Sequence, residues 1–315
     1  MEFRHLKTLK TVVEAGGITR AAEQLGYAQS SVTMQIHALE EELGTPLFDR
    51  LGKKMVLTAA GEKLWNYAIL LLNMHDEAVE AVRSHTEPAG TLTIGTPESL
   101  AAFRLPALIQ AYKRRFPKVK LVLKPGLCTE MRSLLRRGEL DLAFLLEAEH
   151  EEEEDLVVET LVNEEMALVA AKDHPLVTVK EVKPKNIQNE TFLQTEKGCS
   201  YRTLFEQYLL RNGINVDQGE EFWSIEAIKN CVHAGLGLAF LPVIAVKKEL
   251  QEGKLCSLRW QDERCRVYTK MAFHKKKWIS PALKEWIELV RNQAELWRRE
   301  WSDGESKFFN RNRCS

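Results

Sequence analysis

The sequence lacks the hydrophobic runs and export signals that mark membrane and secreted proteins. None of its 315 residues belongs to an apolar run of about 18 residues, the length that a membrane-spanning helix needs. Residues 1–7 contain no apolar stretch followed by a small-residue cleavage site, so we expect no secretory signal. The six cysteines are scattered and form no C-x-x-C pair, which favours reduced thiols over a disulfide framework or a zinc site. We therefore expect a cytoplasmic protein with no bound metal.

The sequence also lacks the short motifs of the common enzyme classes. It has no P-loop, no G-x-S-x-G, no H-E-x-x-H and no G-x-G-x-x-G after a strand. Gly235 and Gly237 come nearest to a dinucleotide loop, but the third glycine is missing. The formal net charge is only -1, so any contact with nucleic acid must come from a local surface. We expect no catalytic residue, no cofactor and no enzyme activity.

Three short helices are predicted in the first part of the chain. Apolar residues recur at helical spacing in residues 3–15, 19–25 and 29–43, with Thr19 as the expected cap of the second helix. Glycines separate the three segments, and Gly26 lies between the second and the third. Two short helices joined by a glycine-containing turn are typical of a helix-turn-helix.

The third predicted helix exposes short and amide side chains rather than a mixture of lysine and glutamate. Such groups fit the major groove of DNA, where glutamine pairs with adenine edges and serine or threonine contacts bases or phosphates. The alternative is a helical bundle with a polar face, because residues 1–58 contain as many acidic as basic residues, which weakens a purely electrostatic case. The candidate DNA-reading residues are Gln29, Ser30, Ser31, Thr33, Met34, Gln35 and His37.

A family resemblance favours the DNA-binding interpretation. The stretches AAEQL (21–25), QSSVTMQI (29–36), LE (39–40), LGTPLFDR (43–50) and LTAAG (57–61) resemble the LysR-type transcriptional regulators. The resemblance implies a recognition helix from Gln29 that enters the major groove of promoter DNA, at a site resembling an inverted repeat. It also implies a wing over residues 49–56, with Arg50, Lys53 and Lys54 near the duplex. Ala28 departs from the family, which usually has serine there, so the side-chain cap of this helix is missing.

A long helix is expected after the wing, with Thr58 as its N-cap. Leu64, Leu71 and Ala78 recur at seven-residue spacing, as in one seam of a coiled coil. Such a helix would span roughly 40 Å and could pair with its copy; a helix buried against its own domain is the alternative. The resemblance implies a homodimer or homotetramer, with RNA polymerase as a further candidate partner.

The remaining two-thirds of the chain alternate strands and helices, which predicts parallel α/β sheets. Residues 138–143 and 234–242 resemble the two signatures of the LysR-type effector domain, whose fold resembles that of periplasmic binding proteins. The expected fold is therefore multidomain: an all-α winged helix-turn-helix DNA-binding domain, a long linker helix and a two-lobed α/β effector domain like a periplasmic binding protein. The expected boundaries are 1–58 for the DNA-binding domain, 59–87 for the linker and dimerisation helix, 88–302 for the effector domain (lobe I about 91–161 and 268–302, lobe II about 162–267) and 303–315 for a polar tail.

A small-molecule effector of unknown identity is expected between the lobes, near the starts of helices. Free amides at helix N-termini and nearby hydroxyls bind carboxylates and other anions, and Arg202 could add a bidentate clamp. The alternative is that these hydroxyls only cap helices. The candidate effector-binding residues are Thr96, Ser99, Thr129, Thr195, Ser200, Tyr201 and Arg202.

The expected function is sequence-specific promoter binding controlled by an effector in the inter-lobe cleft. One alternative is a thiol-based redox regulator, since Cys199 lies near the reactive cysteine of peroxide-sensing relatives. The position of their resolving cysteine holds Tyr208 here, which disfavours this alternative. A solute-binding protein without a DNA function is the other, and the N-terminal helices speak against it. The sequence does not decide between activator and repressor.

Overall fold

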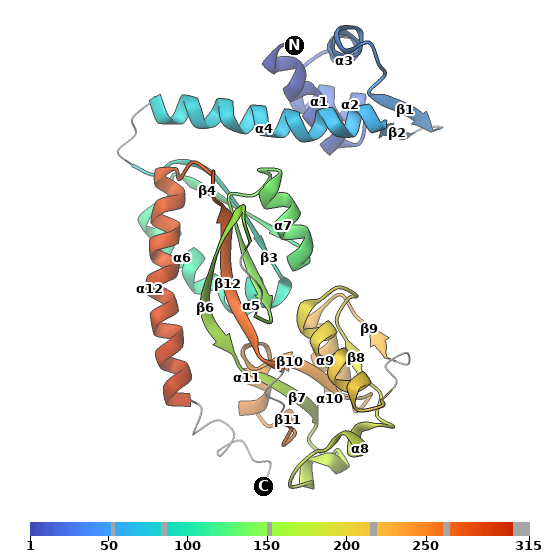
Figure 1. Cartoon of the computed structure of the whole chain (residues 1–315), viewed down its shortest axis with the longest axis vertical. Coiled ribbons are helices and arrows are strands. Elements are labelled where there is room, and N and C mark those ends of the chain that lie inside the picture. Colours follow the sequence, from blue (N-terminus) through green and yellow to red (C-terminus); the bar gives the residue numbers. More distant parts are fainter. Residues whose placement is uncertain (52–53, 83–86, 150–152, 215–218, 261–264, 305–315) are drawn as a thin grey trace. The chain divides into compact units, whose positions relative to one another are not determined.

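The computed structural model describes residues 1–51, 54–82, 87–149, 153–214, 219–260 and 265–304. The chain divides into two compact units (Figure 1). The first is built on residues 1–82 and the second on most of residues 87–304. Each unit has its own hydrophobic core. The expected multidomain fold is confirmed.

The first unit is a winged helix-turn-helix. Three helices pack around buried leucines and valines such as Leu9, Val32 and Leu39. Gly26 adopts a φ of 67°, which ends the second helix and makes the tight turn into the third. Thr19 lies inside the second helix rather than capping it, because Gly17 is the residue that precedes the first turn. The elements are α1 (Phe3–Ala15), α2 (Ile18–Leu25), α3 (Gln29–Leu43) and the antiparallel wing strands β1 (Phe48–Leu51) and β2 (Lys54–Leu57).

The long helix α4 (Ala59–Val82) begins where Thr58 caps it, as predicted. The Thr58 hydroxyl accepts a hydrogen bond from the Gly61 amide at 3.0 Å. Leu64 and Leu71, two residues of the predicted seam, pack partly against the core of the same unit. The apolar residues that α4 leaves most open are instead Tyr67 and Met74, each 66% exposed. Tyr67 and Met74 are two of the positions that the predicted seam allows between its leucines, so the exposed apolar stripe contains one half of that seam.

Lobe I of the second unit is a five-stranded sheet covered by helices on both faces. Strand β5 shows this best: Leu142 and Phe144 lie in one hydrophobic cluster, and Ala143 and Leu145 in another. Helices α6 and α12 cover the first face, and α7 covers the second (Figure 1). In sheet order the strands are β4 (Val119–Pro125), β3 (Gly90–Thr96), β5 (Leu142–Glu147), β12 (Val267–His274) and β6 (Leu156–Glu164). The helices are α5 (Glu98–Phe103), α6 (Leu105–Arg115), α7 (Cys128–Arg136) and α12 (Pro281–Gly304).

Lobe II is a smaller sheet with its own helices. An aromatic cluster that includes Phe205, Phe240 and Trp260 fills its core. The strands are β10 (Ala239–Pro242), β7 (Met166–Ala171) and β11 (Leu255–Ser257), with the short pair β8 (Leu193–Gln194) and β9 (Glu220–Glu221). The helices are α8 (Pro184–Ile187), α9 (Ser200–Arg211), α10 (Ile225–His233) and α11 (Val243–Gln251), and a 3-10 turn spans Pro175–Thr178.

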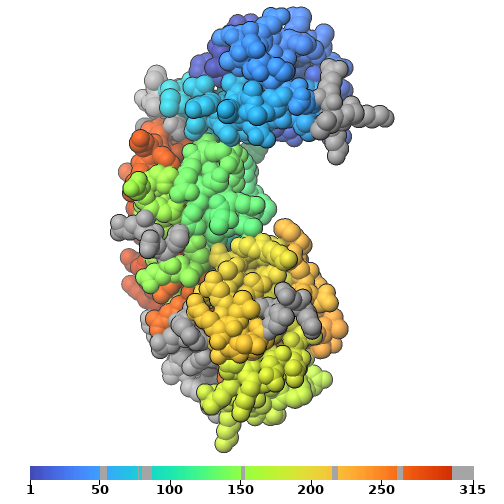
Figure 2. Space-filling model, turned by 45° about the vertical axis from the view of Figure 1, so that its right-hand side comes forward, coloured from blue at the N-terminus to red at the C-terminus, as the bar shows by residue number. Residues whose placement is uncertain are grey.

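The sheet of lobe I is mixed and the three-stranded sheet of lobe II is antiparallel, whereas strand–helix alternation predicts parallel sheets. Strands β3, β4 and β5 are parallel, as predicted. In each lobe, the strand on which the chain enters from the other lobe runs antiparallel to its neighbours: β12 in lobe I and β7 in lobe II. In Figure 2 the green residues of lobe I and the yellow residues of lobe II abut.

Helix α12 continues to the last residues that the structure describes. Ala294 and Trp297 are buried in the lobe I core. Arg298 donates a hydrogen bond to the carbonyl of Leu161, on β6, at 2.7 Å. The helix extends through residues 303 and 304, where the predicted polar tail begins, and residues 305–315 lie outside the described residues.

Two further expectations from the sequence concern membrane-spanning helices and the state of the cysteines. Within the described ranges, no helix is both long and apolar enough to cross a membrane. Cys256, on β11, is disulfide-bonded, which contradicts the prediction of reduced thiols throughout. Cys128, Cys199 and Cys231 are free thiols, as predicted.

Candidate functional sites: a helix face and an inter-lobe pocket

Helix α3 turns a face of short side chains to the solvent. Ser30, Thr33, Met34 and His37 follow the spacing of one helical face, and Met34 is 70% exposed. The buried residues Val32, Ile36 and Leu39 hold the opposite face against α1 and α2. Ala28 precedes the helix without a side-chain cap hydrogen bond, as predicted, so amides of the first turn have no protein side chain over them.

Two predicted reading residues are engaged within the helical unit. The side-chain oxygen of Gln35 accepts a hydrogen bond from the buried Thr8 hydroxyl at 2.6 Å, so this amide is directed toward α1 and not outward. Thr33 donates to the Gln29 carbonyl at 3.0 Å, which leaves its methyl group and oxygen lone pairs at the surface. Ser31 is only partly exposed, whereas Gln29 is exposed.

The wing carries the predicted basic residues, of which the described structure gives the backbone only. Arg50 lies on β1 opposite Met55, and Lys54 lies on β2 opposite Leu51. Lys53 lies outside the described residues.

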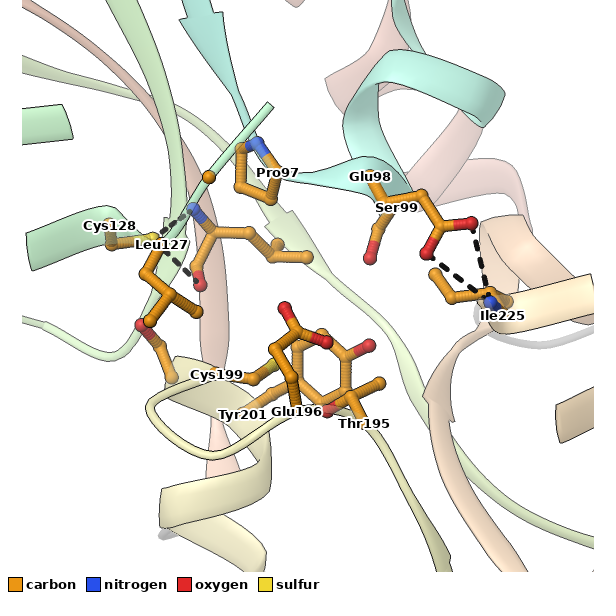
Figure 3. A pocket seen from close by; sticks show the side chains of 13 residues that line it. Pro97, Glu98, Ser99, Leu127, Cys128, Thr195, Glu196, Cys199, Tyr201 and Ile225 are labelled. Carbon is orange, nitrogen blue, oxygen red and sulfur yellow. Dashed lines mark hydrogen bonds between the residues drawn. The ribbon is translucent and has the colours of Figure 1, made fainter. Parts of the chain in front are cut away.

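A pocket of about 360 Å³, including its open mouth, lies between lobes I and II (Figure 3). Helices α5 and α7 supply the wall from lobe I, and α9 and α10 supply the wall from lobe II. The lining residues are Pro97, Glu98, Ser99, Gly126, Leu127, Cys128, Leu146, Thr195, Glu196, Cys199, Ser200, Tyr201 and Ile225.

Four of the seven predicted effector residues line this pocket: Ser99, Thr195, Ser200 and Tyr201. The other three lie elsewhere, and each has a structural reason. Thr96 is fully buried and donates to the Pro97 carbonyl at 3.2 Å. Thr129 is exposed on α7 away from the lining.

Arg202 does not form the predicted clamp. Its guanidinium donates to the carboxylates of Glu206 at 2.7 Å and Glu221 at 2.8 Å, and also to the Thr195 carbonyl. The side chain faces a second, smaller cavity lined by Phe192, Phe205 and Phe240 rather than the inter-lobe pocket. With two carboxylates already bound, Arg202 fixes the loop before α9 and leaves the pocket without a cation.

Glu98 joins the two lobes at the pocket. Its two carboxylate oxygens accept from the Ile225 amide at 3.3 and 3.2 Å, so a lobe I side chain covers the first amide of α10 in lobe II (Figure 3). Partial burial raises the pKa of Glu98, and the negative charges of Glu196 and Glu226 act in the same direction. Two like charges close to Glu98 make the mouth of the pocket electronegative.

Thr195 presents a hydroxyl without a hydrogen-bond partner. The residue is only 5% exposed, and its Oγ1 has no partner among the described residues. The Cys199 thiol lies beside it, and the Thr195 hydroxyl lowers the pKa of that thiol against the larger effect of burial. A buried hydroxyl without a partner costs roughly 1–3 kcal/mol, so an incoming polar group would be stabilised there.

The two thiols of the pocket are poor nucleophiles. Burial raises the pKa of Cys199 to about 11 and also raises the pKa of Cys128. Because the thiolate is the reactive form, both side chains remain protonated and unreactive near neutral pH.

Several pocket residues escaped the sequence-based selection. Leu127 and Ile225 form apolar walls, and Glu196 adds a carboxylate beside the predicted Thr195. Ile225 lies 127 residues after Glu98 in the sequence, and no local sequence pattern predicts the contact between them. Glu98 and Glu196 are each adjacent in the sequence to a candidate residue, Ser99 and Thr195, and this adjacency could have identified them.

Comparison with family models identifies both units. The model of the LysR substrate binding domain matches residues 85–295, which is more than half of the chain. The model of the bacterial regulatory helix-turn-helix protein, lysR family, matches residues 3–62.

Curated relatives extend over nearly the whole chain. The HTH-type transcriptional regulator YwqM of Bacillus subtilis, described as uncharacterized, is 47% identical over 292 residues, covering 92% of this chain and 99% of the relative. The HTH-type transcriptional regulator GltR of Bacillus subtilis is 34% identical over 298 residues, covering 95% of this chain and 99% of the relative.

Solved structures share the fold at low sequence identity. Full-length OxyR from Pseudomonas aeruginosa superposes with a TM-score of 0.72 at 22% identity, covering 94% of this chain and 95% of its own. Full-length CbnR complexed with its target DNA gives a TM-score of 0.65 at 23% identity, covering 93% and 99% of the two chains.

Proposed function

The chain belongs to the LysR family of helix-turn-helix transcriptional regulators, a DNA-binding and effector-responsive family, and we propose that the exposed face of α3 reads the operator while the inter-lobe pocket holds the effector. The observation that carries the reading role is the α3 face itself. Ser30, Thr33, Met34 and His37 present small polar and apolar groups on one solvent-facing side of a rigidly packed helix. Groups of this size reach base edges and thymine methyl groups in the major groove.

The uncapped start of α3 supports this role. With Ala28 at the N-cap, no cap side chain accepts from the amides of the first helical turn. A DNA phosphate fits such an N-terminus, because the free amides and the helix dipole favour an anion. The basic residues Arg50, Lys53 and Lys54 of the wing would add phosphate contacts that depend on salt concentration.

The reading role can be tested with two matched threonine variants. Thr33 on α3 and Thr11 on α1 each donate to the carbonyl four residues earlier, at 3.0 and 2.9 Å. We expect Thr33→Ala to weaken binding to a duplex enriched from a random-sequence pool by about tenfold, while Thr11→Ala leaves binding unchanged. Fluorescence anisotropy at fixed salt measures both. Equal effects of the two substitutions would remove Thr33 from the reading face.

The inter-lobe pocket suits the effector because both lobes contribute to it. A ligand that contacts Ser99 of lobe I and Thr195 of lobe II favours one arrangement of the lobes over others. That preference, transmitted to the DNA-binding heads of an oligomer, would change the affinity or bending of the operator. A ligand that changed neither would refute the switch.

A dimer would place two reading heads on one operator. The exposed Tyr67 and Met74 give α4 an apolar stripe suited to a second copy of the chain. The regulator would act in the cytoplasm, where promoter DNA and RNA polymerase are found, and would need no cofactor and no enzyme activity. The raised pKa of Cys199 disfavours a thiol switch at this pocket.

A further inference from the structure

The walls of the inter-lobe pocket carry negative charge only. Its thirteen lining residues include the carboxylates of Glu98 and Glu196 and no lysine, arginine or histidine. Arg202, the cation that the sequence predicted for this site, lies outside the lining and forms ion pairs with Glu206 and Glu221. A carboxylate ligand would therefore enter a site that offers neutral donors and two like charges.

One helix N-terminus at the pocket, the start of α10, is already covered. Glu98 accepts from the Ile225 amide at the start of α10, in the position that a ligand carboxylate would otherwise take. Figure 3 shows the Glu98 side chain reaching from lobe I to the Ile225 amide of lobe II, and Glu196 on the lobe II loop before α9. The two acids thus face the cavity from opposite lobes.

A buried hydroxyl group in the pocket also points to a polar ligand, independently of the charges. Thr195 lines the pocket, is 5% exposed, and its Oγ1 has no hydrogen-bond partner among the described residues. A hydroxyl oxygen accepts hydrogen bonds, and an ammonium group has three N–H donors and needs acceptors on several sides. Glu98, Glu196 and Thr195 provide such acceptors around one cavity.

The rest of the pocket wall is apolar, so the uncharged part of the ligand is expected to be hydrocarbon. Pro97, Leu127, Leu146 and Ile225 surround the cavity with hydrocarbon. Such a wall favours contact with a short alkyl chain or a small ring.

We propose that the effector is a small organic ammonium compound, whose charged nitrogen lies between Glu98 and Glu196 and donates to Thr195, and whose hydrocarbon part packs on the apolar wall. This inference rests on the proposed role of the pocket as the effector site. It replaces the expectation of an anionic ligand, which depended on Arg202 and on free helix termini. A carboxylate elsewhere on the same ligand remains compatible with the amides and hydroxyls at the start of α9.

Probes of equal chain length test the charge preference. The purified full-length protein is titrated at pH 7 with pentylamine, norvaline, 1-pentanol and pentanoate, and binding is followed by calorimetry. An alkyl amine is protonated at this pH and pentanoate is ionised. We expect pentylamine or norvaline to bind about tenfold more tightly than pentanoate. Equal or tighter binding of pentanoate or pentanol, or no binding of either amine at tens of millimolar, overturns the proposal.

Substitution of Glu98 sharpens the test, because glutamine keeps an oxygen that can accept from the Ile225 amide. We expect Glu98→Gln to weaken amine binding by about fivefold and to reduce the discrimination against pentanoate. Glu196→Gln should act in the same direction. Glu181→Gln, an exposed acid of lobe II outside the lining, is the matched control and should change nothing. Equal effects of Glu98→Gln and Glu181→Gln would overturn the assignment.

Duplex binding by the same protein preparation separates this inference from the proposed function. If an enriched duplex is bound but pentanoate is preferred over the amines, only the ligand class is wrong. If no duplex is bound specifically, the proposed function itself fails.

Discussion

The two units of the chain treat polar groups in opposite ways. Among the described residues of the helical unit, Thr8 is the one buried polar side chain, and Gln35 satisfies it. The effector unit buries six charged side chains, each of them in an ion pair: Arg132, Glu147, Glu164, Arg202, Lys229 and Lys270.

The difference follows from what each unit must hold in place. The helical unit needs only an apolar core, which leaves the short polar groups of α3 free to face a duplex. The effector unit must position two lobes around a cavity, and its buried ion pairs lie on crossing strands, on helices and beside the pocket. Several buried polar atoms of this unit have no partner among the described residues, and one of them, Thr195 Oγ1, belongs to a residue that lines the inter-lobe pocket.

The largest loss of stability is expected from a substitution at Glu164, where the chain passes from lobe I to lobe II. Glu164 accepts from Arg104 at 2.9 and 2.7 Å and from Thr269 at 2.6 Å, and Arg104 stacks on Trp297. Glu164→Ala leaves a buried guanidinium unpaired, so we expect a loss of about 3–5 kcal/mol in the stability of the effector unit. Urea unfolding followed by tryptophan fluorescence measures the loss.

Glu159→Ala is the matched surface control for that prediction. Its partner Arg291 is 52% exposed, so the expected loss is under about 1 kcal/mol. If the two substitutions had the same effect, buried charges would not hold the effector unit together.

A smaller, pH-dependent effect is expected at Glu147. Burial alone would raise its pKa, but hydrogen bonds and charges from Arg132 and Lys270 outweigh burial and hold the pKa below the usual 4.5. A carboxyl with a lowered pKa in the folded state contributes stability above 4.5 and loses it as the pH falls through the lowered value. Glu147→Gln should therefore cost about 2 kcal/mol at neutral pH.

The pH profile separates this charge effect from a packing effect. The gap in stability between the two proteins should narrow as the pH falls below 4.5, because the unfolded chain then binds a proton at Glu147, and it should close once the folded carboxyl is also neutral at its lowered pKa. Chemical denaturation across the acidic range measures the gap. A gap that stayed constant with pH would mean that packing, rather than charge, makes Glu147 important.

The smallest effects concern helix caps in the helical unit, where no buried charge is involved. Thr58→Ala removes the oxygen that accepts from the Gly61 amide and should cost about 1 kcal/mol. Ala28→Ser places a capping hydroxyl before α3 and should gain about 0.5 kcal/mol, because the backbone there already has the extended conformation of an N-cap. Thermal unfolding of the two variants should shift in opposite directions, and shifts in the same direction would contradict this account.

The sequence predicted the helical unit well because its evidence is local. Helical periodicity places Val32, Ile36 and Leu39 inside, and the turn at Gly26 depends on one residue that tolerates a positive φ. The error at Gln35 arose because its partner Thr8 lies 27 residues away, on another helix.

The pocket was predicted less completely because distant segments build it. The hydroxyls at the starts of helices were identified, but Ile225 and Leu127 carry no local sign of a site. Arg202 was misplaced because neighbouring residues on a helix point about 100° apart, so that Tyr201 can face the pocket while Arg202 faces Glu206 and Glu221. Charge type was readable from the sequence, but the partners that neutralise each charge were not.

The base preference of the α3 face is the most direct measure of the central claim. Random-sequence duplexes are selected in parallel by the full-length protein, by a Thr33→Ala/Met34→Ala variant and by Thr11→Ala, and the retained pools are sequenced. The account predicts one enriched motif for the unmodified protein and Thr11→Ala, and a changed preference at specific base pairs for the double variant. An identical motif from all three proteins, or no enrichment at low salt, would contradict it.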